Sequence, residues 1–210
     1  LLQEHGDAPP TRVRALVAHK QRMLYIGTLD HPRRVYVSDP GLPESVNVSA
    51  SFVDLTDETT FSDEALGGIG GFLGMAAIFL ERSIWTLSGR LTLNGAILDI
   101  ERRKTSAATG AVSIRAVGRV PRGATFLDEK GNAVQTSQVT LAYLTPLGDL
   151  RLFDGEHDTI IGYAKSDLFS RMSYQAKHKA FCVIDTPRTE ITWCFPHDSA
   201  SENSIAVSWN

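Results

Sequence analysis

Phe79-Leu80-Glu81-Arg82-Ser83-Ile84-Trp85 joins two apolar runs through a short polar connection. The runs on its two sides, 75–79 and 83–87, contain the β-branched and aromatic residues that suit a pleated, half-buried surface. Two such runs separated by a few turn residues are typical of a β-hairpin. This stretch therefore predicts a pair of antiparallel strands.

The same pattern recurs along the chain. The segment 143–150 also places two apolar ends around a short turn sequence, Thr145-Pro146-Leu147-Gly148. Strong helical periodicity is scarce, and one short helix is expected near Ser166 to Arg171. Further representative runs that we predict to be strands are 23–26, 34–37, 138–143, 149–153, 179–184 and 190–195. The chain is therefore expected to be all-β.

Strand-rich units recur at a regular spacing. Residues near the starts of these units stand 53, 48 and 55 positions apart: Leu16, Ile69, Val117 and Met172. Repeats of about 40 to 50 residues are typical of β-propeller blades, small antiparallel sheets that cannot bury both faces without a neighbour. The sequence thus predicts a β-propeller-like array of about four antiparallel blades, near 13–40, 66–100, 114–155 and 168–210.

Two polar segments interrupt this pattern. The stretch 42–64 contains Pro43, Ser45, Asn47 and five acidic residues from position 54 onward, and it is predicted to be a long loop between blades. The basic run Arg102-Arg103-Lys104, followed by 105–110, is predicted to be a loop as well.

Composition bounds the classes of protein to consider. The 210 residues are 42% apolar, enough for a real core, and 21 basic side chains against 24 acidic ones give a net charge of −3. The net charge therefore gives no overall positive electrostatic potential that would attract nucleic acid or anionic lipid. The longest nearly uncharged stretch, Leu66 to Leu80, holds five glycines and falls short of the ~20 residues that cross a bilayer, so we expect buried strand and no membrane span.

The sequence carries few chemical motifs. Gly67-Gly68-Ile69-Gly70-Gly71 lacks the third glycine and the following helix of a dinucleotide-binding loop, and close backbone packing at the start of a blade is expected instead. The six histidines show no zinc-ligand spacing, and no Gly-x-Ser-x-Gly elbow occurs. We expect His157-Asp158 and His197-Asp198 to be solvated turn residues, and we predict no catalytic, cofactor-binding or metal-binding residues.

The basic and acidic runs raise two other classes of ligand, nucleic acid and carbohydrate. Arg33-Arg34 and Arg102-Arg103-Lys104 lack the interleaved aromatics that stack bases, so sequence-specific nucleic-acid binding is not expected. A glycosidase is harder to exclude, because its two carboxylates are set by distance in space, and the acidic run from Asp54 to Glu64 could supply one. The strand aromatics that we expect in the core between blades are Trp85, Phe153, Phe181 and Trp193.

Four stretches carry a resemblance to a known family. In chain order they are RVYVSDPGLPES at 34–45, IFLERSIWTLSG at 78–89, LGDLRLFDG at 147–155 and TEITWCFP at 189–196. Together they span most of the chain, and it resembles the β-propeller structural proteins of bacteriophage virions, including the tail nozzle and packaged-DNA stabilisation proteins of short-tailed phages. Each stretch is a hairpin signature, so their order is more informative than any one of them.

The resemblance implies a non-enzymatic virion protein, made in the bacterial host cytoplasm, that forms a ring around the DNA exit channel of the tail. Its implied partners are other copies of itself, adjacent tail or connector proteins, and passing double-stranded DNA contacted without sequence specificity. No cofactor and no active-site residue carry over. Because the host cytoplasm is reducing, Cys182 and Cys194, which lie on one predicted hairpin, are expected to be free thiols.

The sequence departs from the family in length. Such proteins are usually much longer, and the chain opens with Leu1 rather than Met, so we expect a portion of a larger polypeptide. Nozzle, hub and head-closure roles stay open. Two alternatives from other classes also stay open: a carbohydrate-binding or carbohydrate-cleaving propeller, motivated by the acidic run, and a cellular interaction scaffold.

Overall fold

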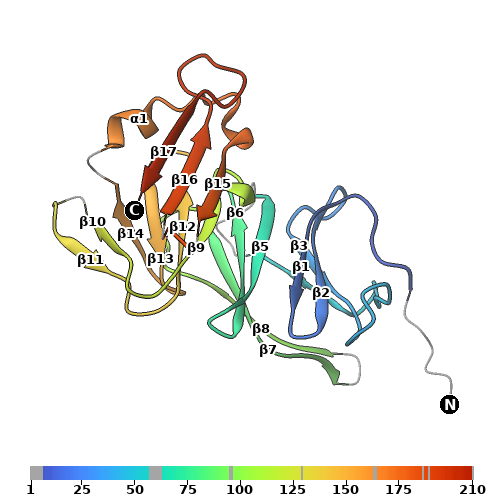
Figure 1. Ribbon diagram of the computed structural model, residues 1–210. Coiled ribbons are helices and arrows are strands. Elements are labelled where there is room, and N and C mark those ends of the chain that lie inside the picture. The colour runs from blue at the N-terminus through green and yellow to red at the C-terminus, as the bar shows by residue number, and fades with distance from the viewer. Residues whose placement is uncertain are drawn as a thin grey trace. The chain divides into compact units, whose positions relative to one another are not determined.

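The computed structural model describes residues 7–56, 63–94, 97–128, 130–162, 165–185, 187–188 and 190–209, except for the side chains of 90–98. The chain divides into two compact units, Leu1–Thr105 (unit 1) and Ser106–Asn210 (unit 2). The described elements are strands apart from one short helix and short 3₁₀ turns (Figure 1). The predicted fold class, an all-β array of blade-like antiparallel sheets, is confirmed.

Unit 1 begins with sheet A, whose strands follow one another in sequence order. They are β1 (Val13–His19), β2 (Arg22–Thr28), β3 (Arg34–Val37) and β4 (Phe52–Asp54), and every neighbouring pair is antiparallel. Lys20 and Gln21 link β1 to β2 with φ values of 47° and 61°, a left-handed turn that matches the twist of a hairpin. Strand β4 lies within 42–64, so the prediction that this whole segment is a loop was wrong.

Sheet B is the second meander of unit 1. Its strands are β5 (Ala65–Phe72), β6 (Met75–Leu80), β7 (Ile84–Asn94) and β8 (Ile97–Lys104), again in sequence order. The hairpin predicted from 79–85 is confirmed, since Ile78 pairs with Trp85 across β6 and β7. Arg102-Arg103-Lys104 was expected to be a loop but belongs to β8, where Lys104 pairs with Trp85.

Sheets A and B share one core, and glycines permit their close approach. Buried Leu24 and Ile26 of β2 pack in one apolar cluster with Ile78 of β6. A β-carbon at Gly68 would lie 2.7 Å from Ile78 Cδ1, and one at Gly70 would overlap the carbonyl oxygen of Ala18 on β1. The expectation that this glycine-rich stretch serves close backbone packing at the start of a blade is confirmed.

Gly70→Ala is predicted to destabilise unit 1 by about 3 kcal/mol, because the added methyl group meets the β1 backbone and forces β5 away from it. Gly74→Ala is the matched control. A β-carbon at Gly74 meets no atom within 4 Å, so only its left-handed backbone (φ +78°) adds a cost, of about 1 kcal/mol. Urea unfolding curves measure both changes. Equal losses for the two variants would contradict close packing at Gly70.

His19 closes β1 in a buried position. Its Nδ1 accepts a hydrogen bond from the backbone N–H of Gly71 at 3.0 Å, which requires the neutral ring. Burial, with a smaller contribution from the charge of Lys20, lowers the pKa of His19 below its usual value. The unfolded chain therefore takes up this proton at a higher pH than the folded chain does.

Stability of unit 1 is predicted to fall as pH drops below about 6.5, the ordinary histidine value, and to level off below the lowered folded pKa of His19. His19→Gln keeps an acceptor for the Gly71 N–H but cannot titrate. Chemical denaturation at about pH 7.5 and about pH 5 compares the two proteins. The wild type should lose more stability than the variant, and parallel losses would refute the role of His19.

Unit 2 begins with sheet C, in which a hairpin interrupts the meander. Its strands are β9 (Val117–Val120), β12 (Thr140–Leu144), β13 (Leu150–Phe153) and β14 (Asp158–Ile161), in the order β14-β13-β12-β9. The inserted hairpin, β10 (Thr125–Leu127) and β11 (Ala133–Gln135), lies between β9 and β12 in sequence and forms its own two-stranded sheet. The hairpin predicted at 143–150 is the β12–β13 connection, where Leu144 pairs with Leu150.

Sheet D completes unit 2. It consists of β15 (Phe181–Asp185), β16 (Glu190–Phe195) and β17 (Ile205–Trp209), in that order. The predicted short helix is α1 (Ser166–Ser170), and two 3₁₀ turns, η1 (Ile114–Ala116) and η3 (Lys177–Lys179), precede β9 and β15.

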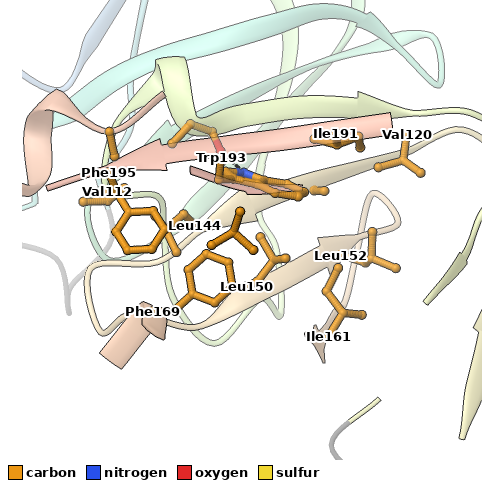
Figure 2. Close-up of a cluster of buried hydrophobic side chains, with 14 of the residues drawn as sticks. Val112, Val120, Leu144, Leu150, Leu152, Ile161, Phe169, Ile191, Trp193 and Phe195 are labelled. Atoms are coloured by element: carbon orange, nitrogen blue, oxygen red, sulfur yellow. Dashed lines mark hydrogen bonds between the residues drawn. The ribbon is translucent and has the colours of Figure 1, made fainter. Parts of the chain in front are cut away.

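The core of unit 2 lies between sheets C and D (Figure 2). Trp193 is fully buried, and its indole N–H donates to the Ala116 carbonyl at 3.3 Å. Phe169 of α1 stacks on Phe195 with ring centroids 5.1 Å apart, so the helix covers one end of the core. Buried Leu144 belongs to the same cluster.

Both cysteines are free thiols, as expected. Cys182 pairs with Trp193 across β15 and β16, while Cys194 is the next residue along β16. Successive side chains of a strand point to opposite faces of the sheet, so the two thiols do not face each other. Burial raises the pKa of Cys182 to about 11, which disfavours its reactive thiolate.

Candidate functional site

A pocket of about 560 Å³ lies within unit 2. Its walls come from β9 and the following loop, from β10, and from the three strands of sheet D. Buried Val120, Phe126 and Ile191 form its interior. The half-buried indole of Trp209 also lines it, and the ring centroids of Trp209 and Phe126 are 6.0 Å apart. Val120 and Ile191 also face the core drawn in Figure 2.

Hydrogen bonds of Thr136 connect the two ends of the inserted hairpin. The hydroxyl of Thr136 donates to the Pro121 carbonyl at 2.8 Å, and its backbone N–H donates to Ala124 at 2.9 Å. Gly123, with φ +88°, makes the turn between these two residues and donates its N–H to Thr136 at 2.8 Å. The loop that walls the pocket is therefore held in one conformation.

A glycine also allows sheet D to reach β9. A β-carbon at Gly118 would lie 3.0 Å from Ile184 Cδ1 and 3.1 Å from the Cys182 sulfur. Because Gly118 has no side chain, β15 packs directly on β9 and brings Ile184 to the pocket. This close approach defines one side of the opening.

The mouth of the pocket carries basic groups. Arg119 and Arg122 line it and are solvent-exposed. The pocket is also lined by the carboxylate of Asp185. One of its oxygens accepts a hydrogen bond from the backbone N–H of Arg188 at 3.2 Å, and the other lies 3.6 Å from Nε of Arg188. Lys165 does not line the pocket; its ammonium lies 5.5 Å from the Trp209 ring centroid and donates to the Ser208 carbonyl at 2.9 Å.

Two apolar side chains of the lining are partly exposed. Val139 and Ile184 are 41% and 37% exposed. They offer apolar surface to a ligand that enters the pocket.

A second polar cluster lies in sheet C. The Asp158 carboxylate accepts three hydrogen bonds: from Arg151 Nη1 at 2.9 Å, from the Tyr143 hydroxyl at 2.7 Å, and from the backbone N–H of Ala108 at 3.1 Å. The Asp158 side chain is only 5% exposed, so the expectation that it is a solvated turn residue was wrong. Burial and the Asp158 charge raise the pKa of Tyr143 well above its usual value. The cluster ties together β12, β13 and β14.

Asp158→Asn is predicted to destabilise unit 2 by about 3 kcal/mol, because it leaves the largely buried Arg151 with only the longer, 3.5 Å pair to the more exposed carboxylate of Asp149. Tyr143→Phe removes the hydroxyl that contacts Asp158 at 2.7 Å and the Thr109 carbonyl at 3.3 Å, and it should cost about 1 kcal/mol. The control is Arg171→Gln. It breaks an exposed, two-bonded pair with Asp198, worth at most about 1 kcal/mol. Denaturant unfolding measures all three, and a loss for Asp158→Asn no larger than the control's would contradict the prediction.

Three acidic residues of the run from Asp54 to Glu64 have side-chain partners within unit 1. Asp54 forms a two-bonded pair with Arg34, at 2.7 and 2.9 Å, and Glu64 pairs with Arg14. The buried carboxylate of Asp63 accepts from the Ser83 hydroxyl at 2.7 Å. The other two acids of the run, at positions 57 and 58, lie outside the described residues.

The structure confirms some of the predictions for the remaining aromatic and histidine residues and contradicts others. Trp85, Phe153 and Trp193 are buried, as expected, while Phe181 is half-buried with the guanidinium of Arg115 5.4 Å above its ring. His157 is exposed in a turn, as expected. His197 was expected to be solvated, but its side chain is 12% exposed and lies 3.0 Å from the carboxylate of Asp198.

Sequence reasoning missed the pocket. Pro121-Arg122-Gly123 signals a turn, but neither its arginine nor its neighbours predict that distant strands close around it. Within the described residues, no group of three or more His, Cys, Asp or Glu side chains is placed to hold a metal ion. The described helices include none long and apolar enough to cross a membrane.

The fold and the pocket define a class: an all-β protein of blade-like antiparallel sheets, with an apolar pocket behind a basic mouth in its second unit. Comparison with known proteins finds no protein-family model and no curated protein that matches this chain.

Proposed function

We propose that this protein is a non-catalytic structural component of a bacteriophage tail, acting as part of a nozzle, hub or head-closure ring around the DNA exit channel. Its partners on this proposal are further copies of the same protein, adjacent tail or connector proteins, and passing double-stranded DNA. The support comes from the sequence resemblance, from where the resembling stretches lie in the fold, and from a rigid exposed loop.

The observation that carries the proposal is the position of the four resembling stretches. The stretch at 34–45 begins with β3 of sheet A, and that at 78–89 contains the β6–β7 turn of sheet B. The stretch at 147–155 contains β13 of sheet C, and that at 189–196 contains β16 of sheet D. Each sheet therefore contributes one stretch, in the order of the family.

The loop after β3 offers a pre-formed contact surface. The Ser45 hydroxyl donates to the Asp39 carboxylate at 2.6 Å, and the Asp39 backbone N–H donates to Ser45 at 2.8 Å. The Tyr25 hydroxyl donates to the Pro43 carbonyl. These bonds fix the loop while Pro43 and Glu44 stay exposed. A surface ordered in advance loses less conformational entropy when it binds a partner.

Identical chains that surround an axis form closed cyclic assemblies, so the protein is predicted to be a homo-oligomeric ring. Native mass spectrometry of the protein, with electron microscopy of assembled tails, measures its copy number. Several copies arranged on the tail axis are expected.

Glu44→Lys, in the fixed loop, should reduce ring formation, and Asp167→Lys, an exposed change of the same charge on α1, serves as its control. A single copy per particle would refute the ring. A monomer that binds glycans would favour a carbohydrate-binding propeller, and a monomer that binds host-cell proteins would favour an interaction scaffold.

A further inference from the structure

The interior of the unit 2 pocket suits an apolar body. Its volume of about 560 Å³ falls within the range of about 300–1,000 Å³ found for small-ligand sites. Phe126 and Ile191 are each 4% exposed, and the Trp209 indole lies beside Phe126. These walls offer dispersion contacts and few hydrogen-bonding groups, which favours an aliphatic or aromatic body over a sugar.

The mouth of the same pocket suits an anion. Arg119 and Arg122 line the pocket and are solvent-exposed. The lining carboxylate, Asp185, is already contacted by Arg188. Among the lining residues, two arginines therefore outnumber one carboxylate. A guanidinium group presents a planar fork of donors that matches the two oxygens of a carboxylate.

We propose that this pocket binds a small amphiphilic carboxylate. Its apolar body packs against Phe126, Ile191 and Trp209, and its carboxylate lies at the guanidinium group of Arg122. The ligand enters past Val139 and Ile184, which are partly exposed at the opening. This site is independent of the proposed place of the protein in a virion.

The pocket needs little rearrangement to accept such a ligand. The Thr136 hydrogen bonds hold the 121–124 loop in place, and the missing side chain at Gly118 lets β15 close the opposite side. A pre-formed site avoids the entropy cost of ordering loops on binding. Arg122 is solvent-exposed, so its guanidinium can reach the carboxylate without breaking the core.

The test is calorimetric titration of the whole chain with dodecanoate, kept below its micelle concentration. Dodecyltrimethylammonium carries the same tail with the opposite charge, and dodecyl phosphate carries a different anion. Dodecanoate should bind at least about tenfold more tightly than the ammonium compound. It should also change the tryptophan emission, and this change should be lost in Trp209→Phe because Trp85 and Trp193 are buried outside the lining.

Three variants test the location of the site. Arg122→Gln should weaken dodecanoate binding about tenfold, the usual loss for one charge-assisted hydrogen-bonded pair. Arg171→Gln removes an exposed arginine of the same unit that does not line the pocket, and it should leave the affinity unchanged. Val139→Phe narrows the mouth and should weaken binding of every dodecyl compound.

Absence of dodecanoate binding to the wild-type chain would overturn the proposal. Equal affinities for dodecanoate and the ammonium compound, or an unchanged affinity in Arg122→Gln, would show unspecific apolar adsorption and overturn it as well. Tighter binding of dodecyl phosphate would reassign the site to a phosphate ligand.

Discussion

Each sheet of this protein has two faces, and the packing of sheet against sheet is the constraint on which everything else depends. A sheet of three or four short strands cannot bury both faces alone, so in each unit two sheets must come close enough to share a core. Glycine makes this possible. In unit 1 Gly70 leaves room for the β1 backbone, and in unit 2 Gly118 leaves room for Cys182 and Ile184. A side chain at either position would separate the sheets and open the core.

The pocket arises where this packing is interrupted. Between β9 and β12 the chain leaves sheet C, makes the inserted hairpin, and returns. The hairpin leaves apolar side chains at the margin of the core, so Val120 and Ile191 belong both to the core and to the pocket wall. The same apolar side chains thus stabilise the fold and form a cavity, and the arginines of the bordering segment give its mouth a charge.

The charged residues show where sequence reasoning reaches its limit. Asp158 lies beside a histidine in a polar segment, and the local sequence favours a solvated turn. In the fold it is buried because Arg151, Tyr143 and Ala108 supply donors from three other segments. Asp63 is likewise bound by Ser83, 20 positions away. Local sequence reveals a charge, whereas the partner that allows its burial comes from elsewhere in the chain.

The sequence by itself determined the hairpins at 79–85 and 143–150, the short helix, the close packing of the glycine-rich stretch, and the apolar strands β2, β3, β6, β7, β12, β13, β15 and β16. These follow from local periodicity and turn chemistry. Only the tertiary structure decided that β4 and β8 are strands, because each is the last strand of its sheet, and a strand with one neighbour needs no apolar run to be held by its hydrogen bonds. The pocket, too, was decided only by the tertiary structure, because a cavity depends on which distant side chains meet. The packing of sheets, rather than any pattern within one segment, brings together Val120, Phe126, Ile191 and Trp209.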